Sequence, residues 1–331
     1  MGTTIQWTDE TWNPVTGCTK VSAGCKHCYA AGVANRFWGD RKFTDVLTHP
    51  DRLDQPLRWR KPRRVFVNSM SDLFHDDVPD DFIAQVFTVM ARALQHTFQV
   101  LTKRPERMRE WFADSAWERV CQSVITNKVL FKDGEDLDWP LPNVWLGVSV
   151  EDQATADQRI PLLLETPAAV RFVSYEPALG PVDFSAHGAH ALPLSWTYSA
   201  GQGDHHPSGD GRGGWWSDLG HLPGEPPNVD WIIVGGESGP HARPFDVQWA
   251  RDTITQCREE GIPVFVKQLG AKPFQSGSAF DVTNLPPSTL VRANKDATGW
   301  DLITRHRAGG DMAEWPEDLR VRQTPHNYQE D

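Results

Sequence analysis

Short apolar runs recur along the chain, and most of them are followed by a longer stretch with helical periodicity. The runs are continuous rather than alternating, which is typical of parallel strands buried on both faces. The predicted strands are Ile5–Thr8, Val65–Asn68, Phe98–Thr102, Val144–Val150, Val170–Tyr175, Trp231–Val234 and Val264–Lys267, and the clearest predicted helices are Asp80–Gln95, Asp152–Leu164 and Val247–Glu260. The pattern predicts an α/β fold, a partial or full TIM-type βα barrel, with an open doubly wound sheet as the alternative.

The domain organisation follows from where this pattern stops. We expect one barrel domain over residues 1–270 and a C-terminal extension, 271–331, that packs on the barrel. Within the barrel, residues 185–228 are rich in Gly, Pro, Ser and His, which predicts a long flexible insertion.

Composition and charge narrow the class of protein. No apolar run approaches the roughly 18 residues that span a bilayer, and the first residues, MGTTIQWTDETWN, do not resemble a signal peptide. We therefore expect a cytoplasmic protein that is not in a membrane. The net charge of −11 argues against broad nonspecific nucleic-acid binding. Two local basic patches, at 58–64 around Trp59 and at 103–109, nevertheless make nucleic acid an expected partner, with solvated surface as the alternative.

Three of the five cysteines lie close together near the N-terminus, in the segment GCTKVSAGCKHCYA. Six residues separate Cys18 from Cys25, and two separate Cys25 from Cys28. Three thiolates are one ligand short of a closed zinc site or a four-cysteine cluster. A cubane iron–sulfur cluster held by these three would leave one iron open to a small molecule. The odd number of cysteines and the absence of a signal peptide argue against disulfides.

The residues around the cysteines allow two kinds of metal site. Gly17 and Gly24 each precede a cysteine, and glycine lets the backbone adopt positive φ and approach a cluster closely. The alternative is a zinc site completed by His27 or by a distant histidine.

Polar residues follow most of the predicted strands. Because parallel strand ends converge on one edge of the sheet, we expect these side chains to face one cavity. The candidates are Ser69, Asp72, Lys103, Glu176, Glu237 and Lys267. For any one of them, the structural alternative is an ion pair such as Glu176 with Lys103.

Several segments resemble an uncharacterised phage and bacterial family, the phage gene-product thirty-seven/sixty-eight family. The matching segments are WNPVTGCTKVSAGCKHCYA, VFVNSMSDLFHDDVP, LTKRPERM, NVWLGVSVEDQ, RFVSYEPALGP, DWIIVGGESGPHARP, VFVKQLG and EWPEDLRVR. More distantly, a three-cysteine loop after the first strand of a parallel barrel resembles the radical S-adenosylmethionine superfamily, although most of its members have a shorter first cysteine gap.

This resemblance implies a function and a set of site residues. Cys18, Cys25 and Cys28 would ligate a [4Fe–4S] cluster whose open iron binds S-adenosylmethionine, and a reductant protein would be a partner. Ser69, Asp72, Lys103 and Glu176 would bind the cofactor, and Lys103, Glu176, Glu237 and Lys267 would be catalytic.

The expected function is a radical enzyme acting on a nucleic-acid component or modified base. Two alternatives stay open. One is a non-catalytic zinc or iron–sulfur protein that binds nucleic acid or a partner. The other is a metal-dependent hydrolase that uses the strand-end carboxylates.

Overall fold

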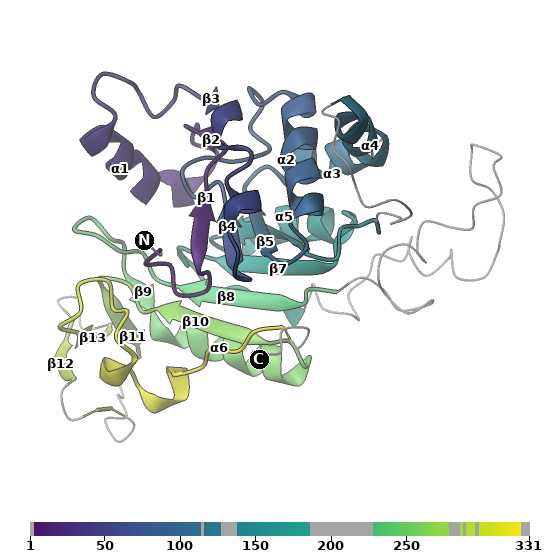
Figure 1. Ribbon diagram of the computed structural model, residues 1–331. Coiled ribbons are helices and arrows are strands. Elements are labelled where there is room, and N and C mark those ends of the chain that lie inside the picture. Colours follow the sequence, from purple (N-terminus) through teal and green to yellow (C-terminus); the bar gives the residue numbers. More distant parts are fainter. Residues whose placement is uncertain are drawn as a thin grey trace.

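Figure 1 shows the computed structural model, which describes residues 3–113, 116–126, 138–185, 228–277, 285–286, 289–294 and 298–325. The insertion predicted over 185–228 lies outside the described residues, apart from its first and last positions. Among the described helices, none is long and apolar enough to cross a membrane.

The main sheet has seven strands that follow one another in chain order, and every neighbouring pair is parallel. The strands are β1 (Glu10–Trp12), β4 (Arg64–Val67), β5 (Thr97–Thr102), β6 (Val144–Val150), β7 (Val170–Tyr175), β8 (Trp231–Gly235) and β10 (Val264–Gln268). The sheet curls into a half-barrel, and in the described part of the chain β1 and β10 do not pair to close it. The predicted α/β fold with a partial parallel barrel is confirmed.

The first strand is not where the apolar pattern predicted it. Ile5–Thr8 is irregular, and the strand that pairs with β4 is Glu10–Trp12, with Glu10 opposite Val65. The prediction was wrong because Ile5 and Trp7 are apolar for another reason: they pack into an aromatic cluster. In the true strand only Trp12 is apolar, so it gives no run.

The structure describes six α-helices, and most of them cover the outside of the sheet. They are α1 (Tyr29–Phe37), α2 (Asp80–Arg92), α3 (Pro105–Ala113), α4 (Ala116–Thr126), α5 (Gln153–Leu164) and α6 (Val247–Glu259). In Figure 1, α2 to α5 lie on one side of the sheet, α6 lies beside β10, and α1 stands apart from α2 to α5. The covering helices are amphipathic: α2, for example, buries Ile83, Val86, Phe87 and Met90. Each such side chain contributes about 1.5–3 kcal/mol when removed from water.

A separate aromatic cluster includes Trp7, Phe66, Trp145, Phe172 and Trp231. The Trp7 ring lies 4.8 Å from the Phe66 ring and 6.3 Å from the Trp231 ring, measured between centroids. A Cβ at Gly147 would lie 2.6 Å from the Phe172 ring, so only glycine leaves room for that ring. Because Trp7, Phe66 and Leu101 also line the cavity described below, this cluster gives the cavity an apolar wall.

The C-terminal residues form a small second sheet and cover one edge of the main one. The small sheet has the order β12 (Leu290–Ala293), β13 (Gly299–Ile303), β11 (Pro273–Ser276) and β9 (Phe245–Asp246). Further along, Val266 donates a backbone hydrogen bond to Val321, and Gln323 donates one to Val264. Residues 321–323 thereby satisfy backbone groups at the edge of β10 that would otherwise be unpaired.

A two-stranded pair, β2 (Val15–Thr16) with β3 (Leu47–Thr48), flanks the cysteine loop.

Candidate functional site

A cavity of about 610 Å³ lies where the parallel strands end. Cys18, Cys25 and Cys28 line it together with residues at or just after the carboxyl ends of β4, β5, β6, β7, β8 and β10. All the strand-end candidates line the same cavity: Ser69, Asp72, Lys103, Glu176, Glu237 and Lys267. The structure therefore brings the predicted residues together, while the role of each stays a prediction.

The cysteine loop runs from β2 through a short 3-10 turn, Ala23–Cys25, to the start of α1. All three thiols are free and partly exposed. Gly17 has a φ of +97°, as predicted, and a Cβ there would lie 2.4 Å from the Asp45 carbonyl oxygen. Gly24 is needed for a different reason. Its φ is not positive, but a Cβ would lie 2.3 Å from Glu151 Oε1, so the loop can approach the end of β6 only through a glycine.

The thiols do not form a ready-made set of metal ligands. Among the described residues, no three His, Cys, Asp or Glu side chains are arranged to hold a metal ion. His27, the predicted fourth ligand of a zinc site, instead stacks on His241 with ring centroids 6.1 Å apart. Three thiols that line one cavity suit a metal cluster with three protein ligands. To bind it, the three cysteine side chains would have to point toward each other.

Arg104, which follows β5, holds the first part of the loop. Its guanidinium donates hydrogen bonds to the Thr19 carbonyl oxygen at 3.1 Å and the Thr19 hydroxyl at 2.9 Å, and its Nη1 lies 3.5 Å from Cys18 Sγ. Burial, together with the charge of Asp72, raises the pKa of the Cys18 thiol to about 11, and Arg104 opposes that rise. Arg104 was part of a predicted basic patch, but sequence reasoning did not place it at the cysteines.

Asp72 positions Arg104. Its carboxylate accepts hydrogen bonds from Arg104 Nη1 at 3.1 Å, Thr102 Oγ1 at 2.7 Å, Lys103 N at 3.0 Å and Phe74 N at 3.0 Å. The side chain is almost fully buried. These four donors occupy much of the carboxylate's hydrogen-bonding capacity, so the geometry favours a positioning role over direct contact with a ligand.

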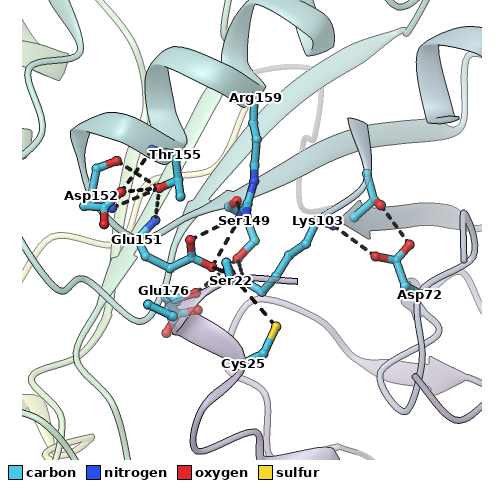
Figure 2. Close-up of polar contacts among 12 residues, drawn as sticks. Ser22, Cys25, Asp72, Lys103, Ser149, Glu151, Asp152, Thr155, Arg159 and Glu176 are labelled. Atoms are coloured by element: carbon cyan, nitrogen blue, oxygen red, sulfur yellow. Dashed lines mark hydrogen bonds and ion pairs between the residues drawn. The ribbon is translucent and has the colours of Figure 1, made fainter. Parts of the chain in front are cut away.

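Glu151 is the centre of the polar network shown in Figure 2. Its fully buried carboxylate accepts hydrogen bonds from Lys103 Nζ at 2.8 Å and Ser22 Oγ at 2.8 Å, and pairs with Arg159 Nη1 at 3.3 Å. Burial alone would raise the pKa of Glu151, but the charges of Lys103 and Arg159 and the hydrogen bonds lower it. The charged partner of Lys103 is therefore Glu151, and not Glu176 as in the ion pair considered as the structural alternative.

Glu151 was not among the candidate residues predicted from the sequence. A signal was available, since Glu151 directly follows the longest apolar run, Val144–Val150, and an acidic group there has to be compensated. Its compensating partners come from positions 22, 103 and 159, and no local pattern connects them.

Glu176 pairs with Lys267 across the ends of β7 and β10. Lys267 Nζ lies 3.1 Å from both carboxylate oxygens, and both side chains are partly exposed on the cavity. Gly235 makes room for the carboxylate, since a Cβ there would lie 2.6 Å from Glu176 Oε1. This pair offers one negative and one positive group to a ligand in the cavity.

Glu237 holds the loop from the opposite side. Its carboxylate pairs with Arg243 through Nη2 at 2.7 Å and Nε at 3.0 Å, and Arg243 Nη1 donates to the Ala23 carbonyl oxygen at 2.9 Å. Burial alone would raise the pKa of Glu237, but the bonds from Arg243 lower it. Glu237 therefore acts through Arg243 on the loop, a link that the sequence did not reveal.

Most basic residues of the two predicted patches form ion pairs, whereas the exposed Arg60 and Lys61 form none among the described residues. In the first patch, Arg58 pairs with Asp54, Arg63 with Glu10 and Arg64 with Asp9. In the second, Arg104 pairs with Asp72, Arg107 with Asp80 and Arg109 with Glu165. Binding of nucleic acid stays a prediction, and within the described residues of these patches Arg60 and Lys61 are the cations that no ion pair neutralises.

Comparison with known proteins identifies a family and little more. No curated protein matches the chain. Among solved structures, a mutant of spore photoproduct lyase aligns with 9% identity and a TM-score of 0.38, and the same enzyme complexed with dinucleoside spore photoproduct aligns with 9% identity and a TM-score of 0.35. Each alignment covers 91% of this chain and 70% of the other. TM-scores this low carry no conclusion about this chain.

A family model covers most of the sequence. The model matches residues 2–308 and is described as a protein of unknown function, DUF5131. The phage family name that the motifs suggested is not confirmed by this match. The chain belongs to the DUF5131 family.

Proposed function

We propose that this protein is an iron–sulfur enzyme of the radical S-adenosylmethionine type. One observation carries the proposal: three cysteines on one loop and a ring of polar strand-end residues line the same cavity at the carboxyl edge of a parallel sheet. Catalytic groups on α/β sheets lie at this edge, because the strand ends and the following loops converge there.

Cys18, Cys25 and Cys28 would hold a [4Fe–4S] cluster. When bound, such a cluster supplies the electron that cleaves S-adenosylmethionine to a 5′-deoxyadenosyl radical, and the protein supplies placement and exclusion of water. The loop that carries the cysteines is held by Arg104 after β5, by Glu151 after β6 and by Arg243 in the segment between β8 and β9. Anchoring of this kind supports a site that must hold a reactive group in one position.

The Glu176–Lys267 pair is the part of the cavity best suited to a zwitterionic ligand. An amino group can take the place of Lys267 beside the carboxylate, and a carboxylate can take the place of Glu176 beside the ammonium. The exchange preserves the charge balance, so neither side chain is left buried without a partner. Ser69 and Lys103 also line the cavity and add a hydroxyl and an ammonium to it.

The second candidate is a non-catalytic zinc or iron–sulfur protein. It would use the same three cavity-lining cysteines as metal ligands but would not bind S-adenosylmethionine. A nucleic-acid component as substrate belongs to the proposal and rests on the resemblance to a phage family and on the basic patches, including the one around Trp59. A reductant protein as partner rests on the resemblance of the cysteine loop.

The proposal is tested by anaerobic reconstitution with iron and sulfide, followed by addition of S-adenosylmethionine and dithionite. We expect the electron paramagnetic resonance spectrum of the reduced cluster to change when S-adenosylmethionine binds, and 5′-deoxyadenosine to appear. A full cluster whose spectrum S-adenosylmethionine leaves unchanged, with no 5′-deoxyadenosine, would favour the non-catalytic alternative.

A further inference from the structure

Helix α1, which follows the last cysteine, exposes an apolar face. Its buried residues are only Ala30 and Ala34, whereas Tyr29, Val33 and Phe37 are exposed by 54%, 39% and 71%. These three residues are spaced four apart, so they lie on one side of the helix. Single exposed apolar residues are ordinary, but an aligned row on one short helix indicates a contact surface.

The segment that contains α1 also carries unpaired positive charge. From Cys18 to Lys42 the chain has five Lys and Arg residues and one acidic residue, Asp40, although the whole chain has 33 basic and 44 acidic residues. Lys20, Lys26, Arg36 and Lys42 are exposed, and none of their side chains forms an ion pair within the described residues. This contrasts with the paired arginines of the patches at 58–64 and 103–109.

The aromatic and the basic groups are interleaved. The Arg36 guanidinium lies 6.0 Å from the centre of the Phe37 ring, and Arg41 lies 4.1 Å from the centre of the Trp38 ring. Cations that neutralise phosphates beside aromatic rings on which bases stack are the two elements of single-strand recognition. An acidic protein partner would bind the positive charges, but its carboxylates would not stack on the exposed rings beside them.

We infer that this surface binds single-stranded nucleic acid. We define the α1 surface as Lys20, Lys26, Tyr29, Arg36, Phe37 and Lys42. Phosphates would lie against the four cations, and bases would stack on the rings of Tyr29 and Phe37.

The α1 surface leads directly into the cavity. Lys20 and Tyr29 line both, and the Tyr29 hydroxyl donates a hydrogen bond to the Ser69 carbonyl oxygen at 2.5 Å, at the end of β4. A strand bound on the surface would therefore place a nucleotide next to the cysteine loop. Binding itself needs no metal, whereas the use of that nucleotide as a substrate rests on the proposed function.

The test is fluorescence anisotropy with a labelled single-stranded dT oligonucleotide and with an RNA of the same length, in a salt series. Four phosphate contacts on a single strand give a slope of about −2.8 in log K against log salt, or roughly a 50-fold loss between 50 and 200 mM. The double variant Lys26→Glu with Arg36→Glu should at least halve that slope. Phe37→Ala should weaken binding by roughly 5- to 150-fold, because one stacked base is lost.

Two control positions lie just before β5, at the amino end of the strands and therefore away from the cavity. Arg92→Glu reverses an exposed arginine and Leu94→Ala truncates an exposed apolar side chain, and both should leave binding unchanged. The proposal is overturned if the wild type does not bind either oligonucleotide at 50 mM salt, if the controls lose as much as the α1 variants, or if polyglutamate competes as well as nucleic acid. All measurements are repeated on metal-free and iron-loaded protein, so a failure of the cluster cannot be mistaken for a failure of binding.

Discussion

Ser22, within the cysteine loop, donates a hydrogen bond of 2.8 Å to Glu151, the first residue after β6. Because Glu151 also pairs with Lys103 and Arg159, this one contact connects the loop to a charge network built around a fully buried carboxylate. Arg104 reaches the loop from the end of β5, and Arg243 reaches it from the segment between β8 and β9. The position of the cysteines therefore depends on residues far from them in sequence.

Replacing Glu151 with glutamine should destabilise the protein by about 3–5 kcal/mol, since the buried Arg159 and the partly buried Lys103 lose their charged partner. The folded-state pKa of Glu151 is lowered, so its contribution is present above the unfolded value near 4.5 and is lost as the pH falls through the lower folded value. Urea unfolding measured between pH 7 and pH 3 should show the difference between wild type and Glu151→Gln shrinking toward acid.

The matched control for this measurement is Glu165→Gln. Glu165 pairs with Arg109 at 2.7 Å, but both side chains are well exposed, so the loss should stay within about 1 kcal/mol. Equal losses in the two variants would mean that the Glu151 network does not behave as a buried one.

Gly24→Ala should disturb the cysteine loop, because the new Cβ would lie 2.3 Å from Glu151 Oε1. We expect it to reduce iron bound after reconstitution to a small fraction of the wild-type value. Gly32→Ala, in α1, is the control: a Cβ there meets nothing within 4 Å, and alanine favours a helix by about 0.5–1 kcal/mol. Similar iron contents in the two variants would show that the close approach to Glu151 is not needed.

Cys18 should alkylate slowly in the metal-free protein. With a pKa of about 11, only about one thiol in a thousand is ionised at pH 8. The rate of reaction with iodoacetamide, followed by mass spectrometry of the Cys18 peptide, should rise about tenfold per pH unit between pH 8 and 10, and urea should remove the protection. A rate that levels off by pH 9 would contradict the raised pKa.

The strand-end residues should separate into two groups. Asp72→Asn should lower iron content, because Asp72 orients Arg104 against the cysteine loop. Lys267→Met should keep the iron but weaken the effect of S-adenosylmethionine on the spectrum of the reduced cluster, because Lys267 faces the cavity away from the loop anchors. Iron analysis beside spectral titration of both variants checks this. Loss of iron in Lys267→Met with retention in Asp72→Asn would reverse the assignment.

Much of the fold could be predicted because parallel strands buried on both faces consist of continuous apolar runs in the sequence. The runs Val144–Val150 and Val170–Tyr175 have the bounds of β6 and β7. The first strand was misplaced because Trp7 is apolar for packing against Phe66 and Trp231 rather than for lying in the sheet. Local periodicity does not distinguish these two causes.

The sequence predicted which residues line the cavity, but it did not predict which of them form ion pairs with each other. Convergence of strand ends placed Asp72, Lys103 and Glu176 on one cavity, as expected. Their ion-pair partners were not predictable: Lys103 pairs with Glu151 and not with Glu176, and Glu176 pairs with Lys267. Which carboxylate lies nearest depends on strand tilt and side-chain rotamers, and the sequence pattern carries neither.

The most direct test of the account is the iron and acid-labile sulfide content of anaerobically reconstituted protein, with zinc measured in the same samples. We predict about four irons and four sulfides per chain in the wild type and in Cys121→Ser and Cys257→Ser. Cys18→Ser, Cys25→Ser and Cys28→Ser should each lose most of the iron. A wild-type protein that is colourless and holds one zinc per chain, or a Cys25→Ser variant that keeps its full iron, would contradict the three-cysteine cluster.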